Sequence, residues 1–242
     1  MAHSIFGMGR PLRPVADGLV YHAINRGNNR DRVFWGDGDF QAFLRSLAQT
    51  QLRYPFELFG YALMTNPFHL LLRPETGQSI NRILQSLTVA HTYRYHRRHR
   101  SVGHVWQGRF KSPVIEDDDH LQVVLRYIEG NPLRAGMVSD LRDDPWTSYA
   151  AHGLGQSNSL ISELPAWSRL AATEAARQEY WRGWVHTPLT EKELATLRRS
   201  VTSGRPFGNE SWVSGMSERL GLSSEPKRRG RPPRSRSAQD AK

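Results

Sequence analysis

The chain has 242 residues, of which 38% are hydrophobic and none is cysteine. This length supports one principal core with a smaller appendage rather than two large domains. The absence of cysteine excludes thiolate zinc sites, thiol nucleophiles and disulfides, and is compatible with the cytoplasm, where we expect the protein. No run approaches 18 consecutive apolar residues and the first ten residues lack an apolar signal segment, so we expect no membrane partner.

The net charge is +10, from 33 basic and 23 acidic residues. Two stretches without Asp or Glu carry it: residues 76–115 hold seven Lys or Arg and residues 227–236 hold six. Such confined basic excess is typical of polyanion binding, because each neutralised phosphate releases counterions. A solvated basic surface is the alternative. The candidate phosphate-contacting residues are Arg94, Arg97, Arg98, Arg100, Arg109, Lys111, Arg229 and Arg231.

Hydrophobic periodicity and turn residues predict seven elements in the first part of the chain. We expect strands at 18–25, 56–64, 68–72 and 111–115, and helices at 39–53 with Asp39 as the cap, from Ser79 onward, and from about Leu121 to a stop at Pro132. The order predicts an α+β, ferredoxin-like or RRM-like fold. In this fold two helices cover one face of an antiparallel four-stranded sheet, and the last helix is extra.

Beyond the core we expect a helical extension and a basic tail. The predicted boundaries are 1–152 for the main domain, 153–222 for the extension and 223–242 for a disordered tail rich in Pro, Arg, Ser and Gly. Four tryptophans suggest aromatic anchoring of short helices, and Thr190 to Glu193 matches a capping box. The tryptophans are Trp167, Trp181, Trp184 and Trp212.

Tyr127 lies in the last predicted helix with two polar residues at helical spacing. Asn131 shares its face because residues four apart do so, and His120, seven positions earlier, lies within about 20° of it. The proline after Asn131 places that amide in the last turn. The stripe carries a phenol, an amide and an imidazole. On spacing alone, an amphipathic helix whose tyrosine packs on the core is the simpler interpretation.

His69 follows a proline in a predicted strand. Alternate strand positions face the same side, so a His-apolar-His triplet would aim two imidazoles at one metal ion. Here Pro67 occupies the first position, and the strand should begin near Phe68. Taken alone, His69 is more simply interpreted as a core histidine.

These segments and three others resemble the single-tyrosine HUH transposases, and among them the REP-associated tyrosine transposases. The resemblance rests on five segments in the family's order, over roughly residues 10–152. They are GLVYHAINRG at 18–27, MTNPFHLLL at 64–72, GHVWQGRF at 103–110, RYIEGNPLRAG at 126–136, and Trp146 with Ser148 and Tyr149. Residues beyond this range are similar only to variable extensions of some members.

The resemblance implies a specific reaction. Such enzymes bind imperfect DNA hairpins, cut an adjacent single strand with the helix tyrosine, hold it as a 5′-phosphotyrosine and rejoin it, which moves DNA by transposition. It makes Tyr127 the nucleophile and His69 the second HUH histidine. Asn131 matches the polar position that approaches the metal. A phenol with a pKa near ~10 needs help at neutral pH, which a divalent cation on the scissile phosphate provides in part.

Pro67 departs from the family, because it replaces the first metal histidine and cannot be a side-chain ligand. Two hypotheses follow. Either Mg²⁺ or Mn²⁺ still binds through His69, Asn131 and His22 with water, or the site is inactive and the protein is a DNA-binding repressor or domesticated remnant.

Two further alternatives concern the nucleic acid bound. An RNA-recognition module fits the sheet, but the chain has no stretch resembling the aromatic RNP signature. In the tail, Arg229-Gly-Arg-Pro232 resembles an AT-hook, which would place Arg229 and Arg231 in the minor groove of A·T-rich duplex. A nonspecific basic tail is the other interpretation. The sequence does not indicate an oligomeric state.

Overall fold

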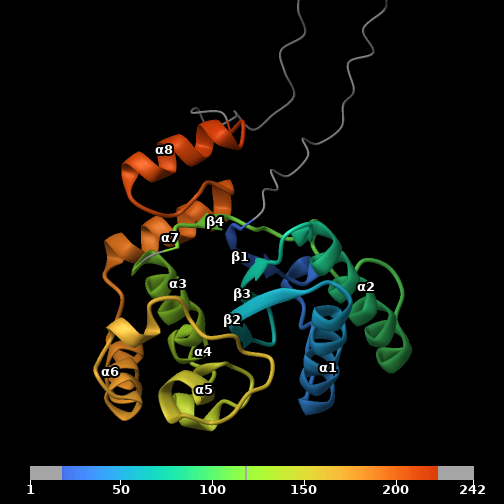
Figure 1. The fold of residues 1–242 in the computed structure, drawn as a ribbon. Helices are drawn as coiled ribbons and strands as arrows, with labels where there is room; N and C mark the ends of the chain where they lie inside the picture. Colours follow the sequence, from blue (N-terminus) through green and yellow to red (C-terminus); the bar gives the residue numbers. More distant parts are fainter. Residues whose placement is uncertain (1–17, 118, 223–242) are drawn as a thin grey trace, which may run out of the picture.

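The structure is a computed structural model and describes residues 18–117 and 119–222. The predicted tail, with Arg229 and Arg231, lies outside the described residues. Within them, four strands form an antiparallel sheet in the order β2-β3-β1-β4 (Figure 1). The strands are β1 (Val20–Asn25), β2 (Phe56–Leu63), β3 (Phe68–Pro74) and β4 (Val114–Ile115). The His69 strand is therefore central, as expected.

Eight α-helices accompany the sheet in the described part of the chain, with the region beyond residue 153 helical as predicted. They are α1 (Asp37–Arg53), α2 (Ile80–His99), α3 (Asp119–Glu129), α4 (Asn131–Arg134), α5 (Tyr149–Leu154), α6 (Glu174–His186), α7 (Glu191–Ser203) and α8 (Glu210–Arg219). Short 3-10 turns lie at Asn28–Arg30, Leu141–Asp143 and Trp167–Arg169. No helix among these residues is long and apolar enough to cross a bilayer.

Helices α1 and α2 pack on one face of the sheet, which we call the α1/α2 face. Alternate strand residues such as Tyr21 and Leu70 point to it and form one core with Phe43 and Leu84 from the two helices. The cap of α1 differs from the prediction, because Gly36 precedes the helix and Asp39 lies in its first turn. The Asp39 carboxylate instead accepts a hydrogen bond from the Trp35 N–H, 2.9 Å away.

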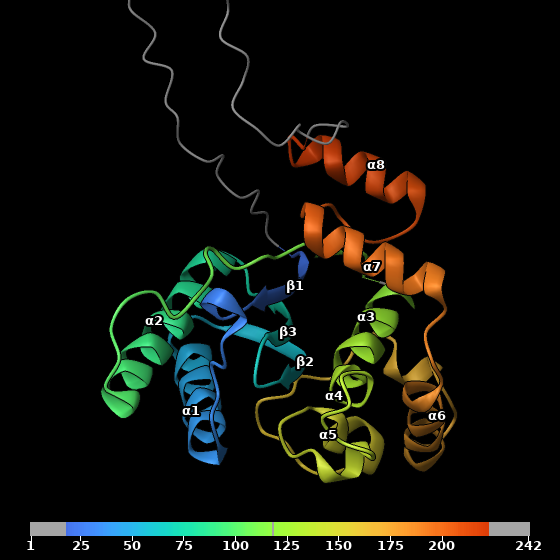
Figure 2. The ribbon, with the colours of Figure 1, turned by 180° about the vertical axis from the view of Figure 1, so that it is seen from behind.

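The opposite face, which we call the α3 face, is covered by the helix that the sequence predicted as extra and by the helical extension. Strand residues including Val20 and Leu71 pack there against α3, and helices α5, α6 and α7 join the same core. Figure 2, seen from behind, shows α1 and α2 on one side of the sheet and α3 to α6 on the other. The apolar stripe of α3 and the tryptophans of the extension supply the second layer.

Gly60 lets α3 approach β2 closely. The β2–β3 register shifts between Leu58 and Gly60, which changes the strand residues that face each layer. A Cβ atom at position 60 would collide with the Leu125 side chain of α3 and lie 2.9 Å from the Ser148 Oγ. The absence of a side chain at this position therefore sets the depth of α3 on the sheet.

A buried carboxylate joins α3 to the extension. Glu129 is fully buried and accepts hydrogen bonds from the Ser148 hydroxyl at 2.5 Å, the His152 Nδ1 at 2.7 Å and the Trp181 Nε1 at 2.7 Å. These donors lie just before α5, in α5 and in α6. One side chain thus fixes three segments that follow α3 in the sequence.

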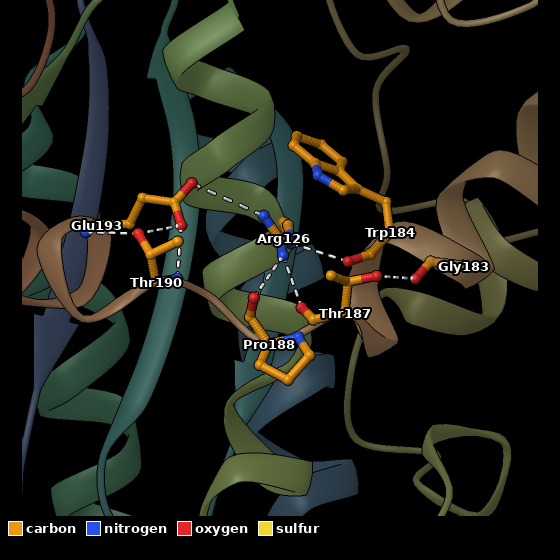
Figure 3. Close-up of polar contacts among 7 residues, drawn as sticks. All are labelled: Arg126, Gly183, Trp184, Thr187, Pro188, Thr190 and Glu193. Carbon is orange, nitrogen blue, oxygen red and sulfur yellow. Dashed lines mark hydrogen bonds and ion pairs between the residues drawn. The ribbon is translucent and has the colours of Figure 1, made fainter.

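A buried arginine holds the connection between α6 and α7 against α3 (Figure 3). The Arg126 guanidinium donates to the carbonyl oxygens of Trp184 at 2.8 Å, Thr187 at 2.6 Å and Pro188 at 3.2 Å. It also lies 3.9 Å from the Glu193 carboxylate, which completes the predicted capping box of α7. Because Arg126 precedes Tyr127, α7 is fixed relative to that tyrosine.

Two predicted boundaries are wrong. The strand expected at 111–115 is reduced to Val114–Ile115, with Lys111 forming only an isolated bridge to Ile24. Pro113 interrupts this stretch because it has no N–H to donate. Pro132 does not end the helical segment either. A short helix, α4, begins at Asn131 with the proline in its first turn, where a backbone N–H is not required.

Candidate active site on the α3 face

Two central strands place a pair of histidines under α3. His22 of β1 and His69 of β3 project from the same face, and both are buried. A hydrogen bond of 3.0 Å joins His22 Nε2 to His69 Nδ1, and the ring centroids are 5.2 Å apart. The strand register thus brings together two histidines that are far apart in the sequence, and they form a hydrogen bond.

Tyr127 of α3 lies edge-on over this pair. Its ring centroid is 6.0 Å from the His22 ring and 6.0 Å from the His69 ring. The side chain is half-buried, so its ring contacts the core while part of it remains accessible. The expectation that the His69 side chain faces the helix carrying Tyr127 is confirmed.

A guanidinium covers the other side of the tyrosine. The Arg134 Cζ atom lies 4.8 Å from the Tyr127 ring centroid, and its Nη2 donates to the Asn131 Oδ1 at 3.0 Å and to the Tyr127 carbonyl oxygen. The Asn131 Nδ2 is buried and has no hydrogen-bond partner in the described part of the chain. The site therefore joins a phenol, an amide, two imidazoles and one fixed cation.

Burial and neighbouring charge determine the protonation of these groups. Burial lowers the pKa of His69 to about 3, with Arg134 acting in the same direction, and burial and His69 lower that of His22. Burial raises the pKa of Tyr127, opposed by Arg134 and Arg198. Arg134 itself has a pKa lowered to about 10, again by burial. At neutral pH the imidazoles are uncharged, the phenol keeps its proton and Arg134 is cationic.

The predicted metal ligands do not fit Mg²⁺ or Mn²⁺ well. These ions prefer oxygen ligands, whereas two of the three candidates are imidazoles whose facing nitrogens bond each other. The Asn131 Oδ1 already accepts a hydrogen bond from Arg134, so a cation there would also meet the guanidinium charge. Within 18–117 and 119–222, no group of three or more His, Asp or Glu side chains is arranged to hold a metal.

The third residue of the predicted helix stripe, His120, does not join the site. Its Nδ1 lies 3.5 Å from the Glu116 carboxylate and its ring contacts Phe207 edge-on. The sequence analysis missed Arg134, although it is seven residues after Tyr127 and three after Asn131. The predicted helix stop at Pro132 concealed this spacing. No sequence motif or spacing around Arg198 of α7 relates it to Tyr127.

Three of the predicted phosphate-contacting residues lie on the opposite side of the sheet from Tyr127. Helix α2, which carries Arg94, Arg97 and Arg98, packs on the α1/α2 face. Arg94 points inward and donates to the Ala42 carbonyl oxygen of α1 at 2.6 Å. The other described members of this set are exposed, namely Arg97, Arg98, Arg100, Arg109 and Lys111. Lys111 also donates to the Thr202 carbonyl oxygen at 3.4 Å, and Arg98 lies 3.3 Å from Asp39.

An exposed stripe runs along α2 and mixes basic with apolar side chains. Its members at helical spacing are Arg82, Val89, Tyr93 and Arg97. Arginines can contact phosphates, and an exposed tyrosine ring can stack on a base. The α1/α2 face thus presents a surface suited to nucleic acid, separate from the site on the α3 face.

Residues 15–131 match the IS200-like transposase family. This part of the chain is similar to the members of that family. The match confirms the resemblance drawn from the motifs, and it includes Tyr127, His69 and Asn131.

One curated relative and two solved structures are similar to parts of this chain. A Haemophilus influenzae protein named as a REP-associated tyrosine transposase is 29% identical over 118 residues, which span 44% of this chain and 66% of that relative. A solved REP-associated tyrosine transposase bound to a REP hairpin is similar in fold, with a TM-score of 0.50 and 16% identity over 65% of this chain and 94% of that one. A transposase-like structure from Deinococcus radiodurans is 20% identical, with a TM-score of 0.36, and covers 50% of this chain and 96% of that chain.

Proposed function

We propose that this protein binds a DNA hairpin and cuts an adjacent single strand through a 5′-phosphotyrosine at Tyr127. The observation that carries the proposal is the position of Tyr127, half-buried over two neutral histidines and beside the Arg134 guanidinium. A phenol held in this way is a nucleophile with a fixed approach direction. The family match and the hairpin-bound relative support DNA as the partner.

In this proposal the α1/α2 face binds the DNA backbone and the α3 face cleaves the strand. The α2 stripe and the neighbouring basic residues hold the phosphate backbone, which supplies affinity without sequence specificity. The α3 face receives the single strand and performs the cut. The attached 5′ end is later transferred to a 3′-hydroxyl, which regenerates the tyrosine and rejoins the DNA.

A DNA-binding function without cleavage is the second candidate. Pro67 favours it, because the family's first metal histidine is missing at the position where its side chain would join His69. A repressor or domesticated remnant would keep the α1/α2 face and lose only the chemistry.

Incubation of the protein with labelled single-stranded hairpin DNA tests the proposal. Reactions with Mg²⁺, with Mn²⁺ and with EDTA are resolved on a denaturing gel, and we expect a covalent protein–DNA band in at least one of them. Tyr127→Phe should abolish this band and keep hairpin affinity within about twofold, because the hydroxyl contributes little to binding. Hairpin binding without adduct in all three conditions would establish the binding-only function instead.

A further inference from the structure

The tyrosine site lacks the first histidine of the metal motif, and it contains an arginine beside the tyrosine. In the resembled enzymes a metal supplies positive charge at the scissile phosphate. Here the Arg134 guanidinium lies 4.8 Å from the Tyr127 ring centroid and bonds the Asn131 Oδ1, the oxygen predicted to approach the metal. Its charge also acts on His69. A cation therefore already lies beside Asn131 and acts on His69, two of the three predicted ligands.

Arg134 is able to bind a phosphate from this position. Arg134 is an exposed residue, so solvent and a ligand can reach its side chain. A guanidinium presents five N–H donors, and in the part of the chain that the structure describes its Nη2 bonds to Asn131 and to the Tyr127 carbonyl are the ones formed. Donors that remain can pair with the two non-bridging oxygens of a phosphodiester in a fork.

A second arginine, Arg198, lies on α7, the helix that packs against the same core as α3. Leu194 and Leu197 of α7 are buried in the core of the α3 face, and Arg198, four residues after Leu194, is exposed at the edge of that buried stripe. Its charge acts on both Tyr127 and Arg134. The Arg126 contacts shown in Figure 3 hold α7 in this position.

We propose that Arg134 and Arg198 bind the scissile phosphate of the DNA and that Tyr127 cuts the strand without a divalent metal ion. This inference rests on the proposed function and specifies its chemistry. Arginine suits the task because its charge is permanent at neutral pH and its donors match the geometry of phosphate oxygens. A divalent ion and Arg134 would compete for the same oxygen of Asn131 and repel each other.

The step is a balanced transesterification. The Tyr127 Oη forms a bond to phosphorus, the bond from phosphorus to the 3′ oxygen of the preceding nucleotide breaks, and the phenolic proton ends on that oxygen as a 3′-hydroxyl. Negative charge grows on the non-bridging oxygens in the transition state, where the two guanidinium groups stabilise it. No oxidant, reductant or further reactant is needed, and rejoining reverses the same bonds.

The test measures the rate of covalent adduct formation by the full chain on single-stranded hairpin DNA, in EDTA and in Mg²⁺ or Mn²⁺. We expect rates equal within about twofold across these conditions. Arg134→Gln should slow adduct formation by about 100-fold or more, as removal of a transition-state donor does, and Arg198→Gln by about tenfold. Arg199→Gln is the matched control. This exposed neighbour on α7 points about 100° away from Arg198, so its rate should not change.

A second substrate separates phosphate binding from a structural role. A methylphosphonate at the scissile position has no charged non-bridging oxygen, so the defect of Arg134→Gln should shrink at least tenfold on that substrate relative to ordinary DNA. Hairpin affinity and thermal unfolding of each variant, measured in parallel, show whether it is folded. If Arg134→Gln does not fold, Arg198→Gln is used for the comparison of methylphosphonate with ordinary DNA, because Arg198 is exposed.

The outcomes distinguish this inference from the proposed function. An adduct that forms only with Mg²⁺ or Mn²⁺ overturns the arginine mechanism and leaves the proposed function intact, as does a folded Arg134→Gln that reacts at the normal rate. A defect of equal size on methylphosphonate and ordinary DNA also overturns it. Absence of adduct in every condition overturns both.

Discussion

The two faces of the sheet are built differently. The α1/α2 face joins helices that are close in sequence through a core of aromatic and aliphatic side chains. The α3 face collects segments from residue 119 to residue 207, and it depends on two buried charged residues, Glu129 and Arg126, each of which binds several later segments. The comparison indicates that the α1/α2 face is held mainly by apolar packing, whereas the layer that holds the tyrosine depends also on buried charged groups with definite geometry.

The largest effect should come from the buried carboxylate of the α3 face. Glu129→Ala leaves the hydroxyl of Ser148, the imidazole of His152 and the indole N–H of Trp181 without their acceptor. We expect a loss of about 3–5 kcal/mol in the free energy of unfolding, measured in urea. The control is Glu163→Ala, an exposed carboxylate, which should change stability by less than about 0.5 kcal/mol. Equal effects would contradict this account of the α3 face.

Removal of the Arg126 contacts should have the next largest effect. Arg126→Met keeps the aliphatic stem but leaves the carbonyls of Trp184, Thr187 and Pro188 without a donor, at a cost of about 2–4 kcal/mol. Amide hydrogen exchange in α7 should accelerate more than exchange in α1. Arg142→Met, in an exposed pair with Asp140, provides the control. Unchanged protection of α7 would show that its own apolar contacts hold it.

The stability of the α1/α2 face should fall in acid because of His91. Burial lowers the pKa of His91 to about 4, while Nε2 donates to the Val33 carbonyl oxygen at 2.9 Å. The unfolded chain, with a histidine pKa near ~6.5, binds this proton first as pH falls, so stability declines between about pH 6.5 and 4. His91→Gln still has a donor for the Val33 carbonyl. Between pH 6.5 and 4, its free energy of unfolding should fall by about 1–3 kcal/mol less than that of the parent protein.

Urea unfolding at several pH values measures this difference. His22 and His69 act in the same direction on the other face, so the variant should retain part of the decline. His104→Gln, at an exposed position, is the control. A variant as acid-sensitive as the parent would show that His91 does not contribute.

Substitutions at the end of α2 should have the smallest effect on stability. They should instead weaken DNA binding. Replacement of Arg97 and Arg98 together by glutamine should weaken hairpin binding by about 3–10-fold at low salt and reduce the slope of log affinity against log salt by up to about 2. Tyr127→Phe should leave both quantities unchanged. A salt series for both variants tests this division. An unchanged slope in the arginine variant would assign the phosphate contacts to other residues.

Local patterns in the sequence predicted much of the fold. Periodicity and turn residues located four strands and the helices between them, and the motif around Tyr127 and His69 identified residues that the structure places together. The α3 face was less predictable, because its cover depends on contacts between α3 and helices far along the chain. Arg134 was within reach of helical spacing, but Pro132 suggested a stop where the structure begins a new turn. Arg198 enters only through the packing of α7, which spacing does not reveal.

The Arg126 contacts have a consequence for how the extension tolerates mutation. All three hydrogen-bond acceptors are main-chain carbonyls, which every amino acid provides. Substitutions at Thr187 should therefore leave its bond to Arg126 in place, and the segment between α6 and α7 is able to change in sequence while its path is preserved. Arg126 thus holds the path of this segment through atoms that do not depend on the identity of its side chains.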